Sequence, residues 1–345
     1  MFLSVLGQSR AYFADPSVLF RGMMYVATFS FLRPLHHSLK TQYHIDIFDL
    51  VVPLASLCSL AAVFLGPLYF PRIYVSFLIF YISSFIILSV NHSLKFRKTI
   101  KNLKGNISAT NDMETNALLK PAYTHVFVIP NYGEPLSLLQ NTIEKIASHT
   151  FAKECYVLVL AMEETEVGHS MKGASLESEF RHRFKEFIVT VHPAGVPGES
   201  PGKASNVGYA ARTAASALVS KGYSMKQMIL TVSDADALFP ELYIQSLEKT
   251  IAETEDPCNT MYAPPIFFSR NHLNVPASVR ITDLIWSIMM MQNLSNQRGV
   301  IFPCSNYSLG YSLAEKVGYW DTDSRAIGED VQMYVILSLT FSSFF

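Results

Sequence analysis

The sequence has few charged residues, no polybasic stripe, and no cysteine or histidine motif of the kind that binds zinc. Charged residues make up 16% of its 345 residues, against about 25% in a typical soluble domain, and the formal net charge is −1. Without a polybasic stripe, we expect no nucleic-acid partner. The 4 cysteines form no C-x-x-C pair and the histidines form no ligand-spaced cluster. Neither a zinc site nor a disulfide framework is therefore supported.

Hydrophobic residues, by contrast, make up 50% of the chain, and two long uncharged runs hold part of this excess, at residues 50–71 and 73–94. Each run is long enough to cross a hydrocarbon core, which takes about 20 helical residues. Only Arg72 separates them, within a Gly- and Pro-containing stretch that suits a tight turn. This pattern predicts a transmembrane helical hairpin. The alternative is a pair of buried core helices, in which two such uncharged runs are rare.

Basic residues flank the two runs on both sides and set the expected orientation. Four precede the first run and five follow the second: Arg10, Arg21, Arg33 and Lys40, then Lys95, Arg97, Lys98, Lys101 and Lys104. By the positive-inside rule, both ends lie in the cytosol. The N-terminus shows no cleavable signal peptide, and the short apolar patch at 22–32 suits an interfacial segment. We expect an integral protein of the plasma membrane or an endomembrane with a cytosolic domain.

After the membrane runs, short β-branched segments alternate with helical patterns. Strands are expected at 125–130, 155–162, 187–192 and 228–233, with a weaker one at 259–265. Helices are expected at 136–149, 176–187, 204–222 and 275–297, and 304–320 combines a loop, a strand-like piece and a helix. This alternation predicts an α/β fold with a mostly parallel sheet. We therefore expect an N-terminal cytosolic or interfacial segment at 1–47 and two transmembrane helices at 48–94. A linker at 95–121 then leads to a folded domain at 122–345.

Polar and charged side chains follow the ends of the expected strands. They are Tyr132, Glu134, Glu163, Lys203, Asn206, Asp234 and Asp236, with Glu329 and Asp330 near the C-terminus. Because ligands of parallel α/β sheets bind outside the carboxyl ends of the strands, we expect these side chains to gather at one rim.

This set of residue types suits an enzyme that transfers a group from a nucleoside diphosphate donor to an acceptor. The two carboxylates of Asp234 and Asp236 can hold Mg²⁺ or Mn²⁺, which keeps waters and phosphates as its other ligands. The metal then neutralises a departing diphosphate, and Lys203 adds a positive charge beside the phosphates. Asp330 can take a proton from an attacking hydroxyl.

The other members have two interpretations each. Tyr132 can stack on a base, or it can be a surface turn residue. Glu134 and Glu163 can accept hydrogen bonds from the ribose or the base. Alternatively, Glu163 and its neighbour Glu164 can be a solvated pair after the strand. A second D-x-D at 321–323 follows a helix end instead of a strand, so we assign it to a turn.

The basic and C-terminal members also have structural alternatives. Lys203 and Asn206 can cap the helix that follows them. Glu329 and Asp330 can be the charged first turn of a helix. The order and placement of the whole set, more than any single motif, favour the functional interpretation.

The motifs resemble those of family-2 glycosyltransferases with the GT-A fold, in particular the membrane-bound branch of cellulose, chitin and hyaluronan synthases. The resemblance covers about residues 123–335 and rests on VIPNYGEP, Glu163 after the second strand, GKASN, SDAD, FPCSNYSLGYSLAEKVGYW and GED. It implies an inverting, metal-assisted hexosyl transfer from a UDP-sugar to a carbohydrate or lipid hydroxyl at the bilayer. Asp330 would be the catalytic base, Asp234 and Asp236 the metal ligands, and Glu163 a uridine contact.

The resemblance also implies that the donor is bound by Tyr132, Glu134, Lys203, Asn206 and Glu329, in addition to Glu163 and Asp234. Processive members carry a Q-x-x-R-W motif beyond the E-D pair, whereas no Arg or Trp follows Gln332 here. We therefore expect a truncated or variant chain, and processivity stays open.

Three other functions compete with this one. An inactive or regulatory paralogue would bind nucleotide sugar or partners without turnover. A nucleotidyltransferase ranks below it, because PNYGEP is not a Gly-rich basic loop. A transporter is disfavoured because only two spans are visible.

Overall fold

The computed structural model describes residues 47–114, 118–264, 272–293 and 305–322, with the single residues 266, 268, 328, 330 and 333. The predicted N-terminal segment therefore lies almost wholly outside the described residues. The chain divides into two compact units, Met1–Ser89 and Val90–Phe345, which are taken separately below.

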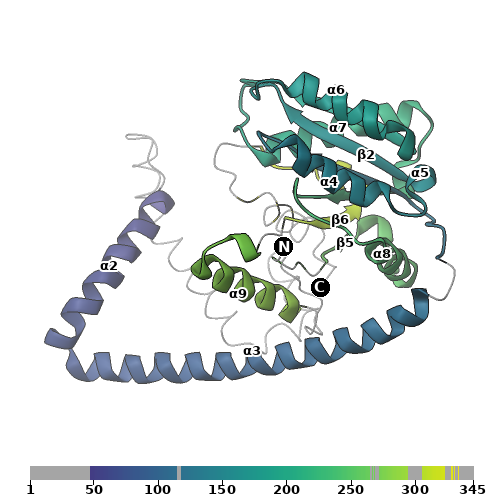
Figure 1. Ribbon diagram of the computed structural model, residues 1–345. Helices are drawn as coiled ribbons and strands as arrows, with labels where there is room; N and C mark the ends of the chain where they lie inside the picture. The colour runs from purple at the N-terminus through teal and green to yellow at the C-terminus, as the bar shows by residue number, and fades with distance from the viewer. Residues whose placement is uncertain are drawn as a thin grey trace, which may run out of the picture. The chain divides into compact units, whose positions relative to one another are not determined.

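In the first unit, the helices α2 (Ile47–Tyr69) and α3 (Pro71–Glu114) cover both apolar runs, and α3 continues into the second unit (Figure 1). Phe70 alone separates them. Its N–H donates to the Gly66 carbonyl and its carbonyl accepts from the Tyr74 N–H, both at 2.9 Å. Since these are helical i to i−4 bonds, the expected tight turn is a one-residue break, and a hairpin is not confirmed.

One helical segment among the described residues, Pro71–Lys98 within α3, is long and apolar enough to cross a membrane. It has 28 residues, and none of its most apolar window is buried in the protein. The apolar stretch Pro53–Tyr69 of α2 is shorter. α3 then runs on to Glu114, so most of the segment predicted as a linker is helical.

The second unit is built on a six-stranded sheet with the strand order β3-β2-β1-β4-β6-β5. Its strands are β1 (Thr124–Pro130), β2 (Tyr156–Glu163), β3 (Glu186–His192), β4 (Met228–Val232), β5 (Met261–Tyr262) and β6 (Tyr307–Gly310). The first four pair in parallel, and β6 is antiparallel to both β4 and β5. The predicted α/β fold with a mostly parallel sheet is confirmed.

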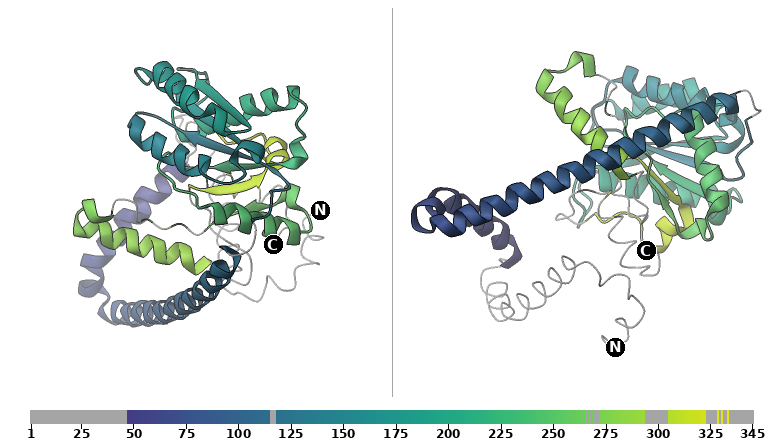
Figure 2. Two further views of the ribbon diagram at one scale, coloured as in Figure 1. Left: turned by 45° about the vertical axis from the view of Figure 1, so that its right-hand side comes forward. Right: turned by 90° about the horizontal axis from the view of Figure 1, so that it is seen from below.

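Helices cover both faces of this sheet (Figure 2). The covering helices longer than one turn are α4 (Leu136–Ala147), α6 (His169–Phe180), α7 (Lys203–Ser220), α8 (Glu241–Glu253) and α10 (Tyr311–Lys316). A further helix, α9 (Ala277–Asn293), has no described residue in either hydrophobic core of this unit. Single turns are α5 (Ala152–Cys155), η3 (Arg181–Arg183), η4 (Met225–Gln227), η5 (Pro257–Asn259) and η6 (His272–Asn274).

Two helix predictions differ from the structure. The helix predicted at 176–187 overlaps the end of α6 but its bounds are wrong, because α6 runs from His169 to Phe180 and β3 starts at Glu186. Phe184 and Phe187 are buried there and contact each other edge to face, with ring centroids 6.0 Å apart. Their burial against the sheet outweighs the helical propensity of the charged residues between them. α8 was not predicted, although Ile244, Leu247 and Ile251 repeat at helical spacing and are buried.

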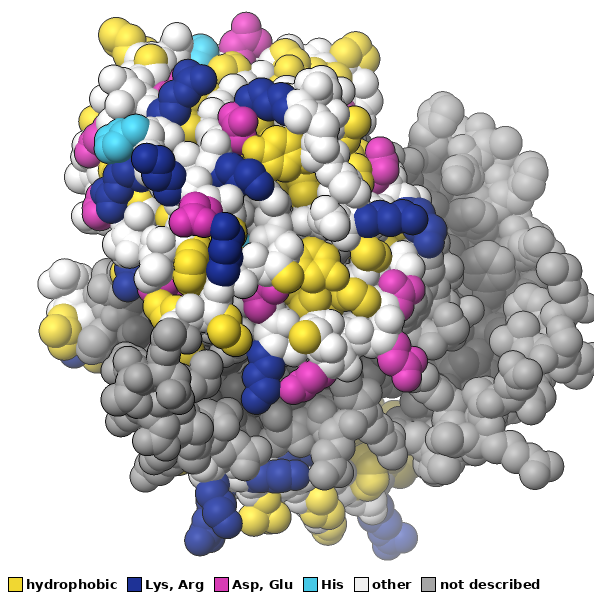
Figure 3. Space-filling model, turned by 90° about the vertical axis from the view of Figure 1, so that its right-hand side faces the viewer, with side chains coloured by type: hydrophobic (Ala, Val, Ile, Leu, Met, Phe, Trp, Pro, Cys, Tyr) yellow, Lys and Arg dark blue, Asp and Glu magenta, His cyan; other side chains and the backbone are white. Residues whose placement is uncertain are grey.

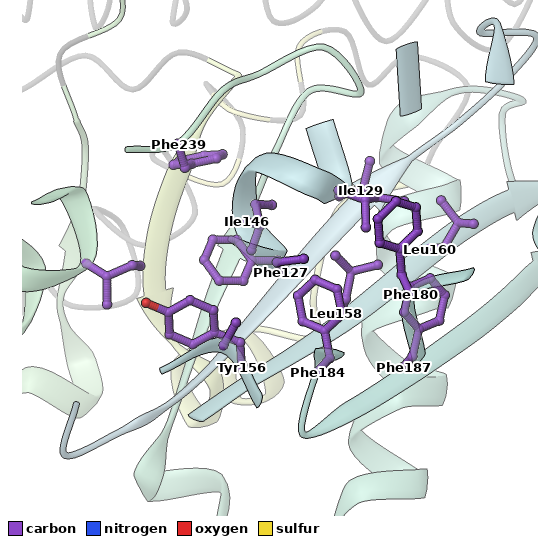
Figure 4. Close-up of a cluster of buried hydrophobic side chains, with 14 of the residues drawn as sticks. Phe127, Ile129, Ile146, Tyr156, Leu158, Leu160, Phe180, Phe184, Phe187 and Phe239 are labelled. Carbon is purple, nitrogen blue, oxygen red and sulfur yellow. The ribbon is translucent and has the colours of Figure 1, made fainter. Parts of the chain in front are cut away.

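Alternate residues of each strand point to opposite faces of the sheet and so build two cores. Phe127 and Ile129 of β1 pack in a core that includes residues of α4, α6 and α8 (Figure 4). Val126 and Val128 pack in a second core with α7 and α10. Both sheet faces are therefore closed by helices, and ligands must reach the sheet at its edges or strand ends.

On the face of this second unit drawn in Figure 3, basic and acidic side chains are interspersed. This mixture agrees with the formal net charge of −1. The described side chains on this face therefore create no field of a single sign that would steer a polyanion towards it.

Gly310, where β6 meets α10, provides a test of the packing. A Cβ atom at this position would overlap the Cys258 carbonyl group, whereas a Cβ at Gly208 would lie 3.5 Å from the Arg212 side chain, an ordinary contact. We expect Gly310→Ala to lower the free energy of unfolding by about 1–3 kcal/mol through overpacking. Gly208→Ala, within α7, should be neutral or raise it by about 0.5–1 kcal/mol. Urea unfolding of both variants in parallel checks this, and equal midpoints would contradict the packing.

Candidate functional site

The carboxyl ends of three parallel strands meet at one edge of the sheet. Pro130 of β1 pairs with Ala161 of β2, and Val128 pairs with Val232 of β4. The hydrogen bonding continues just past the strands: the Asn131 N–H donates to the Ala161 carbonyl at 2.8 Å and the Ser233 N–H donates to the Val128 carbonyl at 3.0 Å. The residues that follow β1, β2 and β4 are therefore brought to the same edge, as predicted.

Asp234 and Asp236 lie in a turn directly after β4. The Ala237 N–H donates to the Asp234 carbonyl at 3.1 Å, which closes the turn. The buried Ala235 accepts a 2.8 Å hydrogen bond on its carbonyl from the Thr142 hydroxyl of α4. Asp236 is exposed and Asp234 is partly exposed. The turn thus holds two carboxylates outside the sheet while its backbone is anchored beneath them.

Lys203, the first residue of α7, forms an ion pair with Asp234. Its Nζ lies 2.7 Å from Oδ1 of Asp234 and 3.4 Å from the carbonyl oxygen of Ser305. The Asp234 N–H donates to Oδ1 of Asn306 at 2.8 Å. The ammonium group therefore faces the strand-end carboxylate, which favours a site role for Lys203 over a capping role.

Asn306 was not among the predicted site residues. It lies just before β6 and is buried, and it fixes the backbone of Asp234 across 72 positions of sequence. No spacing within the sequence marks such a distant partnership. Asn206 of α7 is also buried, and its Nδ2 donates to the Ala161 carbonyl at 3.0 Å. This bond ties α7 to β2, so the described amide contact is not that of a helix cap, and the donor contact expected of Asn206 stays a prediction.

Glu163, at the end of β2, is buried beside a histidine that the sequence analysis did not select. Its Oε2 lies 3.0 Å from Nδ1 of His192, the paired residue of β3, whose Nε2 lies 3.0 Å from Oε2 of Glu199. Arg212 of α7 contacts Glu199 at 3.5 Å. Burial alone would lower the pKa of His192, but its hydrogen bonds to Glu199 and Glu163 outweigh burial and raise it. The solvated Glu163–Glu164 pair considered from the sequence is wrong for Glu163.

Tyr132 and Glu134 lie in the loop between β1 and α4. The Tyr132 ring is 65% exposed, and its N–H donates to the Glu134 carboxylate. Gly133 has φ +81°, a left-handed conformation that favours glycine. Lys172 of α6 donates to the Glu134 carbonyl at 2.7 Å and pairs with the buried Glu166. The loop is thus braced from α6, with the Tyr132 ring outward.

The C-terminal members of the predicted set are only partly described. Glu329 lies outside the described residues, whereas Asp330 lies in a helical position and is partly buried. Met333, one helical turn later, is fully buried in the core that contains Tyr307 and Trp320. The segment that carries Asp330 is therefore anchored on the α7 side of the sheet.

The middle residue of the second D-x-D, Thr322, forms a backbone hydrogen bond to the loop that precedes Lys203. The carbonyl oxygen of Thr322 accepts a 2.8 Å hydrogen bond from the Ser200 N–H, in the Gly- and Pro-rich loop that precedes Lys203. Asp321 is exposed, and Asp323 lies outside the described residues.

Comparison with solved structures and curated proteins gives little detail. A mannosyltransferase, PcManGT from Pyrobaculum calidifontis in complex with GDP-Man and Mn²⁺, is 14% identical with a TM-score of 0.40, over 74% of this chain. The present chain spans 63% of the length of that one. No curated protein matches the chain.

Comparison with protein families is more informative. Residues 229–343 match the profile described as "Glycosyl transferase family group 2". The chain carries a glycosyltransferase domain. The matched segment starts inside β4 and contains Asp234, Asp236 and Asp330, so the turn after β4 lies within it, whereas Lys203 precedes it.

The amide of Asn306 provides a test of how the turn is held. In Asn306→Ala, the Asp234 N–H loses its acceptor, so we expect the free energy of unfolding to fall by about 1–3 kcal/mol. Asn141→Ala removes an exposed amide on α4 and should change it by less than about 0.5 kcal/mol. Urea unfolding of the full chain in detergent measures both, and indistinguishable curves would refute the anchoring role.

Proposed function

We propose that this chain is a membrane-anchored, inverting glycosyltransferase of the GT-A type that moves a sugar from a UDP-sugar to a carbohydrate or lipid hydroxyl. The observation that carries the proposal is the ion pair between Lys203, at the start of α7, and Asp234, just past the carboxyl end of β4. Asn306 fixes the Asp234 backbone, and both Asp234 and Asn306 lie inside the matched segment. A site of this composition suits a diphosphate leaving group.

The diphosphate end of the donor would be held by the turn after β4 and the start of α7. Asp234 and Asp236 offer carboxylate oxygens, the ligands that Mg²⁺ and Mn²⁺ prefer, and the metal would neutralise the charge of the departing diphosphate. Lys203 already lies 2.7 Å from Asp234, so its ammonium group can contact a phosphate oxygen bound at the same place. Asn206 supports this arrangement from beneath by tying α7 to β2.

The nucleoside end would be held by the loops after β1 and β2. The exposed Tyr132 ring offers a flat apolar surface on which a base can stack. Glu163 uses Oε2 to contact His192, and its other carboxylate oxygen can accept from the uracil or ribose. Glu134 bonds the Tyr132 N–H, so it shapes the loop around the base.

The acceptor hydroxyl would lose its proton to Asp330, with Glu329 beside it at the donor. The hydroxyl oxygen forms a bond to the anomeric carbon while the bond from that carbon to the diphosphate breaks, which inverts the configuration. The family match that includes Asp330 supports this assignment.

Metal-dependent transfer tests the proposal directly. We expect the full chain with Mn²⁺ to release nucleoside diphosphate from one member of a panel of UDP-sugars. Asp236→Ala and Asp330→Asn should each lower the rate by about 100-fold or more, and Asp330→Asn should still bind donor. Asp321→Ala, from the second D-x-D, is the matched control and should keep the wild-type rate.

Each outcome of this assay is decisive. Equal rates for wild type and Asp236→Ala would overturn the metal site, and transfer from GDP-mannose alone would replace the UDP-sugar. Calorimetric donor binding without turnover across the panel would favour the alternative, a regulatory paralogue.

The membrane anchor rests on the exposed apolar segment Pro71–Lys98, with the basic residues at its end and just beyond it directing the second unit to the cytosol. Replacing Ile82 and Phe85 by Asp would cost about 2.5–3.5 kcal/mol each at the bilayer centre. We expect that double variant to be extracted from membranes by alkaline carbonate, which should leave the wild type in the pellet. Replacing the exposed Leu119 and Val219 by Asp is the matched control and should not change the distribution. Wild-type extraction would contradict the anchor.

A further inference from the structure

His192 lies between two carboxylates that come from different parts of the second unit. Glu163 belongs to the end of β2 and Glu199 to the loop between β3 and α7, and each lies 3.0 Å from a different ring nitrogen. The side chain of His192 is only 6% exposed, with Glu163 at 11% and Glu199 at 19%. Because both ring nitrogens face acceptors, only the imidazolium form can donate to both.

The other groups around His192 come from α7. The ring of Tyr209 meets the imidazole at a centroid distance of 5.5 Å and an interplanar angle of 69°. Arg212 contacts the far side of Glu199 at 3.5 Å. Two carboxylates, one phenol and one guanidinium therefore contact the histidine or its partners. A third carboxylate, that of Glu164, accepts from the Ala194 N–H at 2.7 Å, and the Glu164 N–H donates to the His192 carbonyl at 3.0 Å.

Glu199 ties this histidine to the proposed phosphate site. It lies in the loop of residues 193–202, which leads directly into Lys203 at the start of α7. Within that loop, Ser200 is bonded to Thr322 through its N–H and to the Ser205 hydroxyl through its carbonyl. The loop is thus fixed at Ser200, and Glu199 fixes it to the end of the sheet.

We propose that His192 is a positioning residue whose protonated form straps the 193–202 loop to Glu163, so that nucleotide binding weakens when His192 loses its proton. The inference rests on the proposed nucleotide-sugar function, because it makes Glu163 and Lys203 the two ends of one binding site. When His192 is neutral, it can donate to only one carboxylate. The other then faces a lone pair, and the two acids lose the positive charge between them.

The direction of the pH effect follows from the two opposing influences on the pKa of His192, which are burial and hydrogen bonding. The pKa of His192 is raised above 6.5 because the hydrogen bonds to Glu199 and Glu163 outweigh burial. When folding raises the pKa of a histidine, its protonated form stabilises the folded state. This stabilisation is complete at pH values below the pKa in the unfolded chain, and it is lost as the pH rises through the pKa in the folded chain. The strap is therefore complete below pH 6.5 and opens at higher pH.

Calorimetric titration of the full chain in detergent with UDP and Mg²⁺, and separately with GDP and Mg²⁺, from pH 6.0 to 8.5 tests the strap. For the nucleotide that binds, wild-type affinity should fall by up to about tenfold for each pH unit above the pKa of His192. His192→Gln should bind weakly at every pH. His182→Gln, an exposed histidine of η3, is the matched control and should follow the wild type.

Glu199→Gln separates positioning from a purely structural role. A side-chain amide at this position can donate to the unprotonated Nε2 while Nδ1–H still donates to Glu163, so the strap needs no imidazolium. We expect this variant to bind nucleotide tightly with no fall between pH 6.0 and 8.5. If His192→Gln does not fold, this variant alone decides, because a wild-type profile in Glu199→Gln would overturn the proposal.

Hydrogen exchange of the 193–202 amides, corrected for the intrinsic pH dependence, gives a readout without nucleotide. Protection should fall with rising pH in the wild type and stay constant in Glu199→Gln. If neither nucleotide binds at any pH, the proposed function fails while the exchange still tests the strap. An equal pH dependence of protection in both proteins would refute the strap itself.

Discussion

The parallel pairing of β1 with both β2 and β4 is the constraint on which the site depends. Because these strands run the same way in a shared register, the chain leaves all three at one edge, with backbone hydrogen bonds extending to Asn131 and Ser233. Residues from distant parts of the sequence then become neighbours with little further folding cost. Lys203 reaches Asp234 because α7 also starts at that edge, where Asn206 fixes it to the Ala161 carbonyl.

The sequence predicts the parts of this arrangement that depend on local pattern. Apolar β-branched runs such as 125–130 and 228–233 predicted the strands, and the rule for strand ends predicted that Lys203 and Asp234 would meet. The same rule distinguished the turn after β4 from the second D-x-D, which follows α10 instead of a strand. These predictions succeed because each rests on a single segment and on the general geometry of parallel sheets.

Hydrogen bonds between segments that are far apart in the sequence could not be predicted from local patterns. Asn306 and Glu199 have no periodicity or neighbour that marks them, and their roles arise only when β6 and the loop after β3 are placed beside the strand ends. The wrong C-terminal bound of the helix predicted at 176–187 has a related cause. Its charged residues favour a helix locally, but Phe184 and Phe187 are buried against the sheet, and tertiary packing decides.

Three acidic residues at this edge have a basic partner from another element. Lys203 pairs with Asp234, Lys172 with Glu166, and His192 with Glu163. Leaving a largely buried carboxylate without its cation costs several kcal/mol, so these pairs restrain the loops as well as balance charge. A negatively charged donor would then meet a site whose buried acids are already paired, and the partly exposed Asp234 and the exposed Asp236 can take a further cation without disrupting a buried pair. This difference in burial is why the turn after β4 suits a metal–diphosphate complex better than the buried Glu163 or Glu166 does.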